Sequence, residues 1–420
     1  MVRAYVLVER LFEHGLLTPA SRLLVVGAGA GGVTAGLHAA HRGANVSIVE
    51  KESLPFFVQR DVSSRWICPT QYDWPMDHWE RAIFPIDESE LPLDWRAAPA
   101  SSTATDWTNQ LETAKRDFRP RLRILTSTEC RNLNESDNAV VAEFKDSSTE
   151  RTESFEFDIV LLCYGFAKET TTIASYTGPE FWRKGLPVWN GSESTVLIVG
   201  GGDGALQDFL LTTTGLKSAR GIFQRIFQPG QRLGIEHEIH CAEDQAQRAA
   251  LWADKLHDHE IFSQLESVHQ NLVERILREE TQIPHNVNAL LDAGNRRAVI
   301  VHPCSHFSRV YALNRFLVLL ILEVLERSGI RARRSGFRAE GIRPADEESH
   351  KCNKDEYCYA FPHNVDLQPM SCLGPSNEKP ETGRFDRIIV RTGPRGAPRP
   401  SRQSLPYHLY PVAKLEGNAE

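Results

Sequence analysis

The segment LLVVGAGAGGVTAGLHAAHRGANVSIVEK, residues 23–51, is the stretch from which the fold can be argued. An apolar run, 23–26, leads into a turn in which Gly27, Gly29 and Gly32 have G-x-G-x-x-G spacing. Small residues follow over a helical length, and a second apolar run ends at Glu50. This order predicts a strand, a glycine turn, a helix and a second strand, the βαβ unit that binds a dinucleotide.

Each glycine of this turn has its own physical reason. Gly27 permits the sharp turn, Gly29 lets a pyrophosphate approach the backbone, and Gly32 lets helix and strand pack closely. The helix N-terminus offers unpaired N–H groups to phosphate, and the acid after the second strand accepts from a ribose diol. The predicted cofactor residues here are Gly27, Ala28, Gly29, Ala30, Gly31, Gly32, Glu50 and Lys51. The competing interpretation is a glycine-rich loop of some other α/β protein.

Composition excludes several classes of function. The 420 residues suffice for two or three domains, and the net charge of −7 argues against nucleic-acid binding as the main role. No apolar run approaches the roughly 18 residues that a membrane span requires. The eight cysteines are scattered and form no C-x-x-C, which favours a reduced, cytoplasmic protein. Homo-oligomer formation stays open.

Residues 54–110 carry five of the eight tryptophans. They line a flavin or substrate pocket, or they fill a loop-rich core, which for any single tryptophan is the commoner case. Tyr72 is a candidate acid–base residue here, and Arg60 a candidate cofactor contact. Further on, 122–165 is predicted as strand, β-ribbon and strand, and the closing strand FDIVLLCYGF brings Tyr164 and Gly165 to the cofactor.

A second glycine motif, TVLIVGGGDGALQDFL, occupies 195–210, and a late strand FDRIIVRTGP occupies 385–394. With these four elements the sequence resembles the two-dinucleotide-binding-domain flavoproteins, the glutathione-reductase-like superfamily that includes flavin monooxygenases and N-hydroxylases. The resemblance covers 20–52, 122–166, 194–213 and 384–394. Its second element matches at Asp158, Leu162, Gly165 and Phe166, with Cys163-Tyr164 in place of the usual Ala-Thr.

The resemblance implies an α/β fold of two Rossmann-like dinucleotide-binding domains with a helical insertion. The first, 1–190, would bind FAD and carry the aromatic insertion 54–110; the second, 191–394, would bind NAD(P)H and carry the helical insertion 241–280; 395–420 would be a tail. The function implied is an FAD-dependent oxidoreductase, monooxygenase-like, in which NAD(P)H reduces flavin and a small molecule is oxidised or oxygenated. The second set of cofactor residues is Gly200, Gly202, Asp203, Gly204 and Ala205.

The sequence departs from the family pattern in three respects. Two of them, the missing Gly-Asp element and Asp203, support an alternative, a catalytically degenerate FAD-binding sensor or scaffold with 241–280 as its partner surface. No redox cysteine pair is present, which disfavours a disulfide reductase. The usual Gly-Asp element that completes FAD binding is not visible after the last strand. Asp203 and Asp208 place carboxylates where a pyrophosphate would bind. Arg220 and Arg225, in an expected strand at 221–227, either hold a 2′-phosphate or lie on the surface.

The remaining predictions concern the second half of the chain. Pro284 is expected to end the helical stretch 241–280; 298–301 is predicted as a strand, 306–327 as a buried helix and 344–383 as a loop. The arginines of 331–343 indicate a solvated basic face, or less often an anion site. His302 and His306 are candidate acid–base residues at a strand end. Two loose groups, His237/His240/Cys241 and His350/Cys352/Cys358/His363/Cys372, lack the repeated spacing of zinc ligands, so no metal is predicted.

Overall fold

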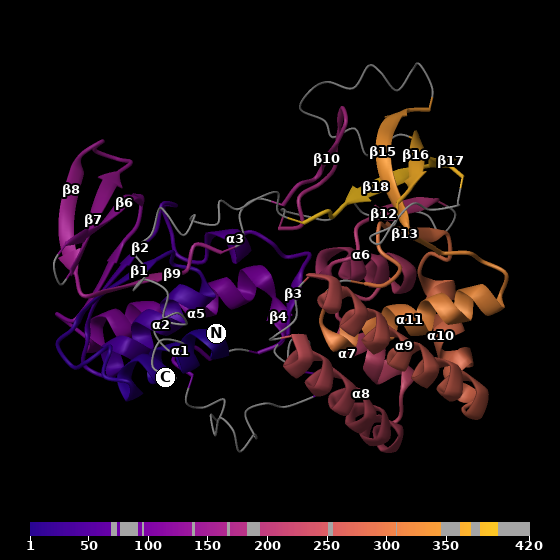
Figure 1. Ribbon diagram of the computed structural model, residues 1–420, viewed down its shortest axis with the longest axis horizontal. Helices are drawn as coiled ribbons and strands as arrows, with labels where there is room; N and C mark the ends of the chain where they lie inside the picture. The colour runs from indigo at the N-terminus through magenta and orange to yellow at the C-terminus, as the bar shows by residue number, and fades with distance from the viewer. Residues whose placement is uncertain are drawn as a thin grey trace. The chain divides into compact units, whose positions relative to one another are not determined.

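The computed structural model describes residues 1–68, 74–75, 91–94, 96–136, 139–165, 169–182, 194–250, 255–307, 309–345, 362–370 and 379–393. These residues pack into two units (Figure 1). Unit 1 takes its described residues from 1–67 and 79–167, and unit 2 takes its own from 68–78 and 168–395. Tyr72 and Phe166 lie outside the described residues, as do Trp79 and Trp95.

Unit 1 is built on a parallel four-stranded sheet with the strand order β5-β2-β1-β9. Its elements are α1 (Val2–Glu13), β1 (Arg22–Val26), α2 (Ala30–His41), β2 (Asn45–Val49), α3 (Phe57–Arg60), β3 (Trp66–Ile67), β4 (Ala98–Pro99), α5 (Ala100–Asp117), β5 (Leu122–Leu125), β6 (Thr128–Ser136), β7 (Ala139–Asp146), β8 (Thr152–Phe157) and β9 (Ile159–Leu162). Between β5 and β9 the chain forms an antiparallel meander, β6-β7-β8.

Unit 2 repeats this plan with a parallel sheet of order β14-β13-β12-β18. Its elements are β10 (Thr172–Ile173), β11 (Tyr176–Thr177), β12 (Val196–Val199), α6 (Asp203–Thr214), α7 (Ala219–Ile226), α8 (Pro229–Ala250), α9 (Lys255–Glu279), α10 (Gln282–Ala293), β13 (Ala298–His302), α11 (Ala312–Arg327), β14 (Arg333–Ser335), β15 (Phe337–Pro344), β16 (His363–Pro369), β17 (Glu381–Phe385) and β18 (Arg387–Val390). A meander, β15-β16-β17, again precedes the closing strand.

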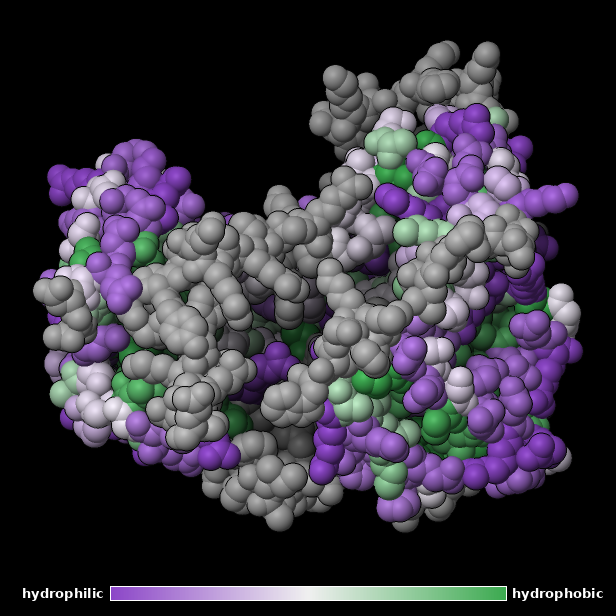
Figure 2. Space-filling view, viewed as in Figure 1, coloured by the Kyte–Doolittle hydropathy of each residue, from purple (hydrophilic) through white to green (hydrophobic). Residues whose placement is uncertain are grey.

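Each unit has three layers because its sheet is apolar on both faces. In unit 1, Leu24 and Val49 pack against the meander residues Val140 and Phe144. In unit 2, Leu197 and Val301 face the second meander, whereas Ile198 and Ile300 face the helices. Figure 2 shows hydrophilic side chains over the meander β6-β8, whose outer strand β8 is exposed along most of its length.

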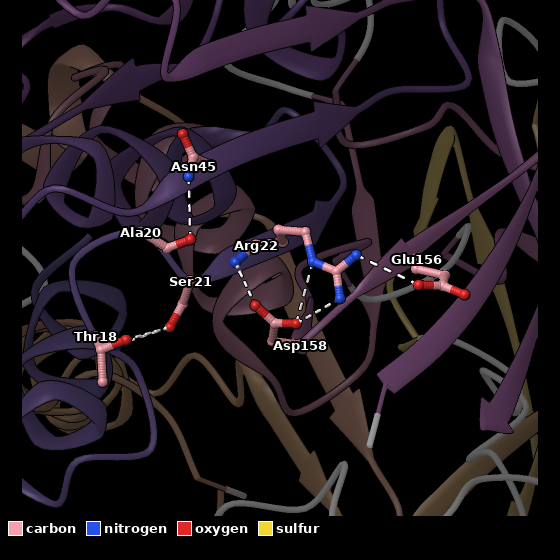
Figure 3. A network of polar contacts seen from close by, with 7 residues as sticks. All are labelled: Thr18, Ala20, Ser21, Arg22, Asn45, Glu156 and Asp158. Carbon is pink, nitrogen blue, oxygen red and sulfur yellow. Dashed lines mark hydrogen bonds and ion pairs between the residues drawn. The ribbon is translucent and has the colours of Figure 1, made fainter. Parts of the chain in front are cut away.

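The closing strand of each unit is tied to the first strand by an aspartate. Asp158 accepts from the backbone N–H of Arg22 at 2.7 Å and from its guanidinium Nη2 at 2.7 Å (Figure 3). In unit 2 Asp386 accepts from the backbone N–H of Thr195 at 2.7 Å. The aspartates of FDIVLL and FDRIIV therefore have one structural role, which sets the register of β9 on β1 and of β18 on β12.

The structure confirms the predicted fold class of two Rossmann-like units and corrects several elements of the second. Residues 219–226 form helix α7 rather than a strand, and the helical insertion spans α7 to α10 rather than 241–280. Pro284 lies in the first turn of α10, where its missing N–H costs nothing, so it does not end a helix. Helix α11 begins at Ala312, not at 306.

The predicted loop 344–383 was also wrong within the part of it that is described. It contains β16 and the start of β17. Residues 363–369 alternate between buried and less buried positions, but His, Asn, Asp, Gln and Pro at five of the seven positions obscure the strand pattern in the sequence.

The described part of the chain has no helix that is both long enough and apolar enough to cross a lipid bilayer. Cys68, Cys130, Cys163 and Cys241 are free thiols, but Cys304 is disulfide-bonded. The expectation of reduced cysteines is therefore wrong for Cys304, because pairing depends on distances set by the tertiary fold and not on spacing in the sequence.

Candidate cofactor sites

The first glycine turn is held in the geometry that a dinucleotide site requires. Gly27 has φ +107°, and a Cβ there would lie 2.4 Å from the Cys163 carbonyl oxygen. A Cβ at Gly32 would lie 2.0 Å from the Gly27 carbonyl oxygen. The turn is fixed to the second strand by the Gly27 N–H, which donates to the Val49 carbonyl at 2.7 Å. No larger residue fits at Gly27 or Gly32 without displacing backbone.

The opposite side of this turn is open. Apart from the chain neighbours, no atom of the described residues lies within 4 Å of the Cβ positions of Gly29 or Gly31. Gly29 is the N-cap of α2 in an extended conformation, and the first turn of α2 carries no acidic residue. The N-terminal N–H groups and the positive end of α2 therefore lie on the open side of the turn, where a ligand can approach the backbone closely, as the pyrophosphate of FAD does.

Glu50 organises the turn as well as being available to a ribose. Its Oε2 accepts from the Ala28 N–H at 2.7 Å and its Oε1 accepts from the Glu52 N–H at 3.0 Å. A carboxylate oxygen can accept more than one hydrogen bond, so both oxygens retain capacity for ribose hydroxyls. Sequence spacing indicated the ribose role but not the bond to Ala28.

Of the other predicted residues of the first site, Tyr164 and Gly165 lie beside the turn, whereas the Lys51 side chain is exposed. Tyr164 is 51% exposed, and Gly165, at φ +75°, has no described atom beyond its chain neighbours within 4 Å of its Cβ position. Both follow β9 directly, beside Gly27, so they border the open side of the turn. Lys51 extends into solvent near Glu52.

Arg60, at the end of α3, donates to Thr108 Oγ1 at 3.0 Å, and its buried Nε has no partner among the described residues. Two of the described tryptophans of the aromatic segment, Trp107 and Trp74, serve the cores. Trp107 is buried, packs against Phe56 and donates from Nε1 to the Asp94 carbonyl at 3.0 Å. Trp74 belongs to unit 2, where its ring packs against Phe316. Tyr72 lies outside the described residues, so its acid–base role stays a prediction.

The second glycine turn has the same backbone geometry as the first. Gly200 has φ +144°, and a Cβ there would lie 2.0 Å from the Arg391 carbonyl oxygen. Its N–H donates to the Val301 carbonyl at 2.8 Å. Gly202 is the N-cap of α6, and in the described part of the chain only its sequence neighbours come within 4 Å of its Cβ position. By contrast, the side chains of Phe181 and Glu169 approach the Cβ position of Gly204, at 3.4 and 3.6 Å.

The two aspartates of α6 are engaged by other parts of unit 2. Asp203 accepts through Oδ1 from the Tyr311 N–H at 2.9 Å and from Asn314 Nδ2 at 2.8 Å. Asp208 is buried and accepts from Arg391 Nε at 2.8 Å. The prediction that Asp208 opposes a pyrophosphate is therefore wrong, because Arg391 neutralises it; Asp203 bonds to the start of α11. Neither partner adjoins these aspartates in the sequence.

Arg220 and Arg225 lie on α7, a helix that begins after Ser218, whose hydroxyl accepts from the Gly221 N–H. The strand expected at 221–227 would have placed these arginines beside a nucleotide. That premise is wrong, since the strand next to β12 is β13.

His302 and His306 are buried. His302 Nε2 accepts from Arg333 Nε at 3.0 Å, and burial lowers the pKa of His302 well below its usual value. His306 Nδ1 donates to the Phe307 carbonyl at 2.7 Å, and its Nε2 lies 2.9 Å from His259 Nδ1. Burial also lowers the pKa of His306. Both histidines are neutral framework residues near neutral pH, and their acid–base role stays a prediction.

Two residues of this region were not singled out for a specific role by the sequence. Arg333 donates through Nη2 to Glu266 Oε1 at 2.6 Å, and Glu266 Oε2 accepts from the Phe307 N–H at 2.6 Å. Glu266 belongs to α9, within the helical insertion. The interpretation of the arginine stretch as a solvated face is thus wrong for Arg333, whose side chain is 20% exposed.

The metal candidates give no arrangement of ligands in the described residues. His237 Nε2 lies 4.0 Å from Cys241 Sγ on α8, and of the second group only His363 is described. Among the described residues, no three His, Cys, Asp or Glu side chains are placed to share an ion.

Comparison with known proteins identifies the first turn. Residues 22–56 match the family model of an FAD binding domain. A search of curated proteins returns no match.

Among solved structures, the chain is similar to thioredoxin reductase from T. acidophilum, at 9% identity and TM-score 0.40, with 89% of this chain and 77% of that chain covered. It is also similar to a cadaverine monooxygenase from Erwinia amylovora, with 9% identity, TM-score 0.44, and 92% and 81% covered. For an ornithine N-hydroxylase from Kutzneria sp. 744 the values are 11% identity, TM-score 0.38, and 89% and 81% covered.

Likenesses at these TM-scores support no conclusion about function, whereas the family match coincides with the open turn and Glu50. The chain therefore carries an FAD-binding segment, residues 22–56, in the first of two Rossmann-like units.

Proposed function

We propose that this protein is an FAD-dependent oxidoreductase that accepts electrons from NAD(P)H and oxidises or oxygenates a small molecule. The observation that carries the proposal is the geometry of the first glycine turn. The Cβ positions of Gly27 and Gly32 are blocked by backbone atoms, whereas those of Gly29 and Gly31 lie on the open side of the turn. The match of 22–56 to an FAD binding domain supports the identity of the dinucleotide.

The residues of unit 1 would bind and orient the cofactor. The N-terminus of α2 would hold the pyrophosphate, and Glu50 would accept hydrogen bonds from the adenosine ribose. FAD, when bound, supplies the redox chemistry, so a separate catalytic triad is not required. The monooxygenase class rests on the sequence resemblance described above, on the second glycine motif and on the absence of C-x-x-C and C-x-x-x-x-C spacings from the sequence.

The second turn is the candidate site for the nicotinamide donor. Support comes from the repeated geometry, since Gly200 and Gly202 reproduce the backbone roles of Gly27 and Gly29. A dinucleotide placed there would meet the N-terminus of α6, as FAD would meet that of α2.

A catalytically degenerate FAD-binding sensor or scaffold is the second candidate. It is favoured by the charged side chains around the second turn, where Asp203 and Arg391 stand at positions that are Ala30 and Cys163 in unit 1. In this function the helices of the insertion would contact a partner. Flavin reduction by a nicotinamide donor separates the two candidates.

The test uses the absorbance spectrum of the purified full chain, followed by anaerobic addition of NADPH and NADH. Gly29→Ala places a methyl group on the open side of the first turn, more than 4 Å from any described residue other than its chain neighbours, and Gly202→Ala does the same in the second. We expect G29A to lose FAD. We expect G202A to retain FAD but to be reduced at least about tenfold more slowly, because the backbone can no longer approach the donor pyrophosphate.

Gly234→Ala on α8 is the matched control, because its Cβ position is likewise more than 4 Å from the described residues beyond its own helix turn. A wild-type protein that cannot take up FAD would contradict the proposal. Flavin that both donors leave oxidised would favour the sensor. An unchanged rate of flavin reduction in G202A would show that the donor does not bind at the second turn.

A further inference from the structure

The two turns can be compared position by position, because each is bonded to its neighbouring strand at the same point. Gly27 donates to Val49 in unit 1, and Gly200 donates to Val301 in unit 2. The residue that follows is Glu50 in the first case and His302 in the second. A Cβ at Gly201 would lie 3.1 Å from His302 Cβ, so His302 adjoins the second turn as Glu50 adjoins the first.

The next strand of each sheet, β5 beside β2 and β14 beside β13, also differs between the units. In unit 1 the residue paired with Ile48 is Ile124, and in unit 2 the residue paired with Ile300 is Arg333. Where unit 1 has the candidate ribose ligand Glu50, unit 2 therefore has a neutral histidine. Where unit 1 has the aliphatic side chain of Ile124, unit 2 has the guanidinium of Arg333. Both changes favour an anion where unit 1 favours hydroxyl groups.

Three contacts hold the Arg333 guanidinium in place. Its Nε donates to His302 Nε2, its Nη2 donates to Glu266 Oε1, and the same Nη2 donates to the Ser305 carbonyl at 3.1 Å. The guanidinium carbon lies 4.3 Å from the ring centroid of Phe307. These contacts use Nε and Nη2 and leave the two N–H groups of Nη1 without a partner among the described residues.

Nη1 is also reachable, since Arg333 is 20% exposed and its Nη1 is not among the buried unpaired atoms. Arg334, the next residue, lies on the other face of β14, where its Nε is 3.5 Å from Glu381. Arg333 is therefore the arginine of this strand that lies on the same face as His302.

We propose that Arg333 Nη1 binds the 2′-phosphate of the adenosine ribose, so that the second turn selects NADPH over NADH. This inference rests on the proposed function and deepens it. His302 and Glu266 act as positioning residues, because they orient the guanidinium without touching the phosphate. Planar N–H groups fixed in one direction are suited to phosphate oxygens.

The experiment measures binding of adenosine 2′,5′-bisphosphate and of adenosine 5′-monophosphate to the full chain by calorimetry. These probes differ only in the 2′-phosphate and require no flavin. A charge-assisted hydrogen bond to phosphate corresponds to an affinity difference of about ten- to a hundredfold, which we expect in favour of the bisphosphate.

The variant is R333M/E266Q, which removes the cation and its buried carboxylate partner together and keeps an unbranched side chain against Phe307. We expect its affinity for the bisphosphate to fall to that for the monophosphate, which itself should not change. The matched control R343M/D366N removes the exposed pair of β15 and β16, whose guanidinium and carboxylate lie 2.8 Å apart, and should preserve the difference.

Equal affinity of the wild-type chain for both probes, or loss of both in R333M/E266Q while the control binds normally, would overturn the assignment of Arg333. Failure of the proposed function has a different signature, namely a chain that discriminates between the two probes but carries no flavin or a flavin that no donor reduces.

Discussion

Asp203 begins α6 at the position where Ala30 begins α2, and the difference between them is a titrating group in the second turn. Burial raises the pKa of Asp203 to about 6, although the Tyr311 N–H and the Asn314 amide donate to its carboxylate and oppose the shift. Asp203 is therefore close to its titration point in the physiological range.

The sign of its effect on stability follows from the direction of the shift. A carboxyl whose pKa is raised by folding stabilises the native state below about pH 4, and this contribution is lost as the pH rises through about 6. Asp203→Asn keeps an Oδ1 that can accept from both Tyr311 and Asn314. We expect the unfolding free energy of the wild type, relative to D203N, to fall by up to about 3 kcal/mol between pH 4 and pH 7, measured by urea unfolding.

Asp158 provides the comparison of opposite sign. Burial alone would raise the pKa of Asp158, but the hydrogen bonds and charge of Arg22 outweigh it, so the pKa is lowered. Its contribution is present above about pH 4 and is lost as the pH falls, and it is small because the pair is largely exposed.

A wild type and D203N whose unfolding free energies differ equally at every pH would show that Asp203 does not titrate between pH 4 and 7.

At the residue scale, a residue's role could be predicted from the sequence where it follows from the steric needs of a turn or from spacing within a βαβ unit. Gly27, Gly29, Gly32 and Glu50 are such residues. The sequence could not show that Arg391 neutralises Asp208 or that Glu266 orients Arg333, because those partners come from elements far apart in the chain.

At the scale of elements, α6 is joined to β18 by the buried pair of Asp208 and Arg391. In unit 1 the corresponding positions, Ala35 and Cys163, are small and uncharged. The fold therefore does not require this ion pair, and breaking it should cost far more than removing it.

A double-mutant cycle measures this difference. Asp208→Asn leaves a buried guanidinium and Arg391→Met leaves a buried carboxylate, so each single change should lower the unfolding free energy by about 3–5 kcal/mol. The double variant should lose less than the sum of the two, since neither charge is left alone. Additive losses in urea unfolding would show that the two side chains contribute independently.

Elements were predicted correctly where their pattern is strong and local, as in β1, α2, β12 and β13. They were missed where polar residues hide the pattern, as in β16, or where a short amphipathic stretch suits either state. Residues 219–226 are such a stretch: the apolar positions Ile222, Phe223 and Ile226 are all buried at helical spacing, but alternation within GIFQRIF also resembles a strand.

At the scale of the whole chain, the two units share strand order, the glycine turn, the aspartate before the closing strand and a meander between the last two parallel strands. The turns and the closing strands could be predicted from the sequence, whereas the second meander was predicted in part as a loop. The units differ in where their extra residues enter: between β2 and α5 in unit 1, and between α6 and β13 in unit 2.

The position of the helical insertion has a consequence for the order in which the chain assembles. Arg22 pairs with Asn45, so β1 and β2 can meet after closing a short loop, whereas Val196 pairs with Ala298 across all the residues of α7 to α10. Closing the longer loop costs more chain entropy and slows the pairing. In pulse-labelled hydrogen exchange during refolding, we expect the amides of β2 to become protected before those of β13. Simultaneous protection would mean that the four inserted helices form first and bring the ends of β12 and β13 together.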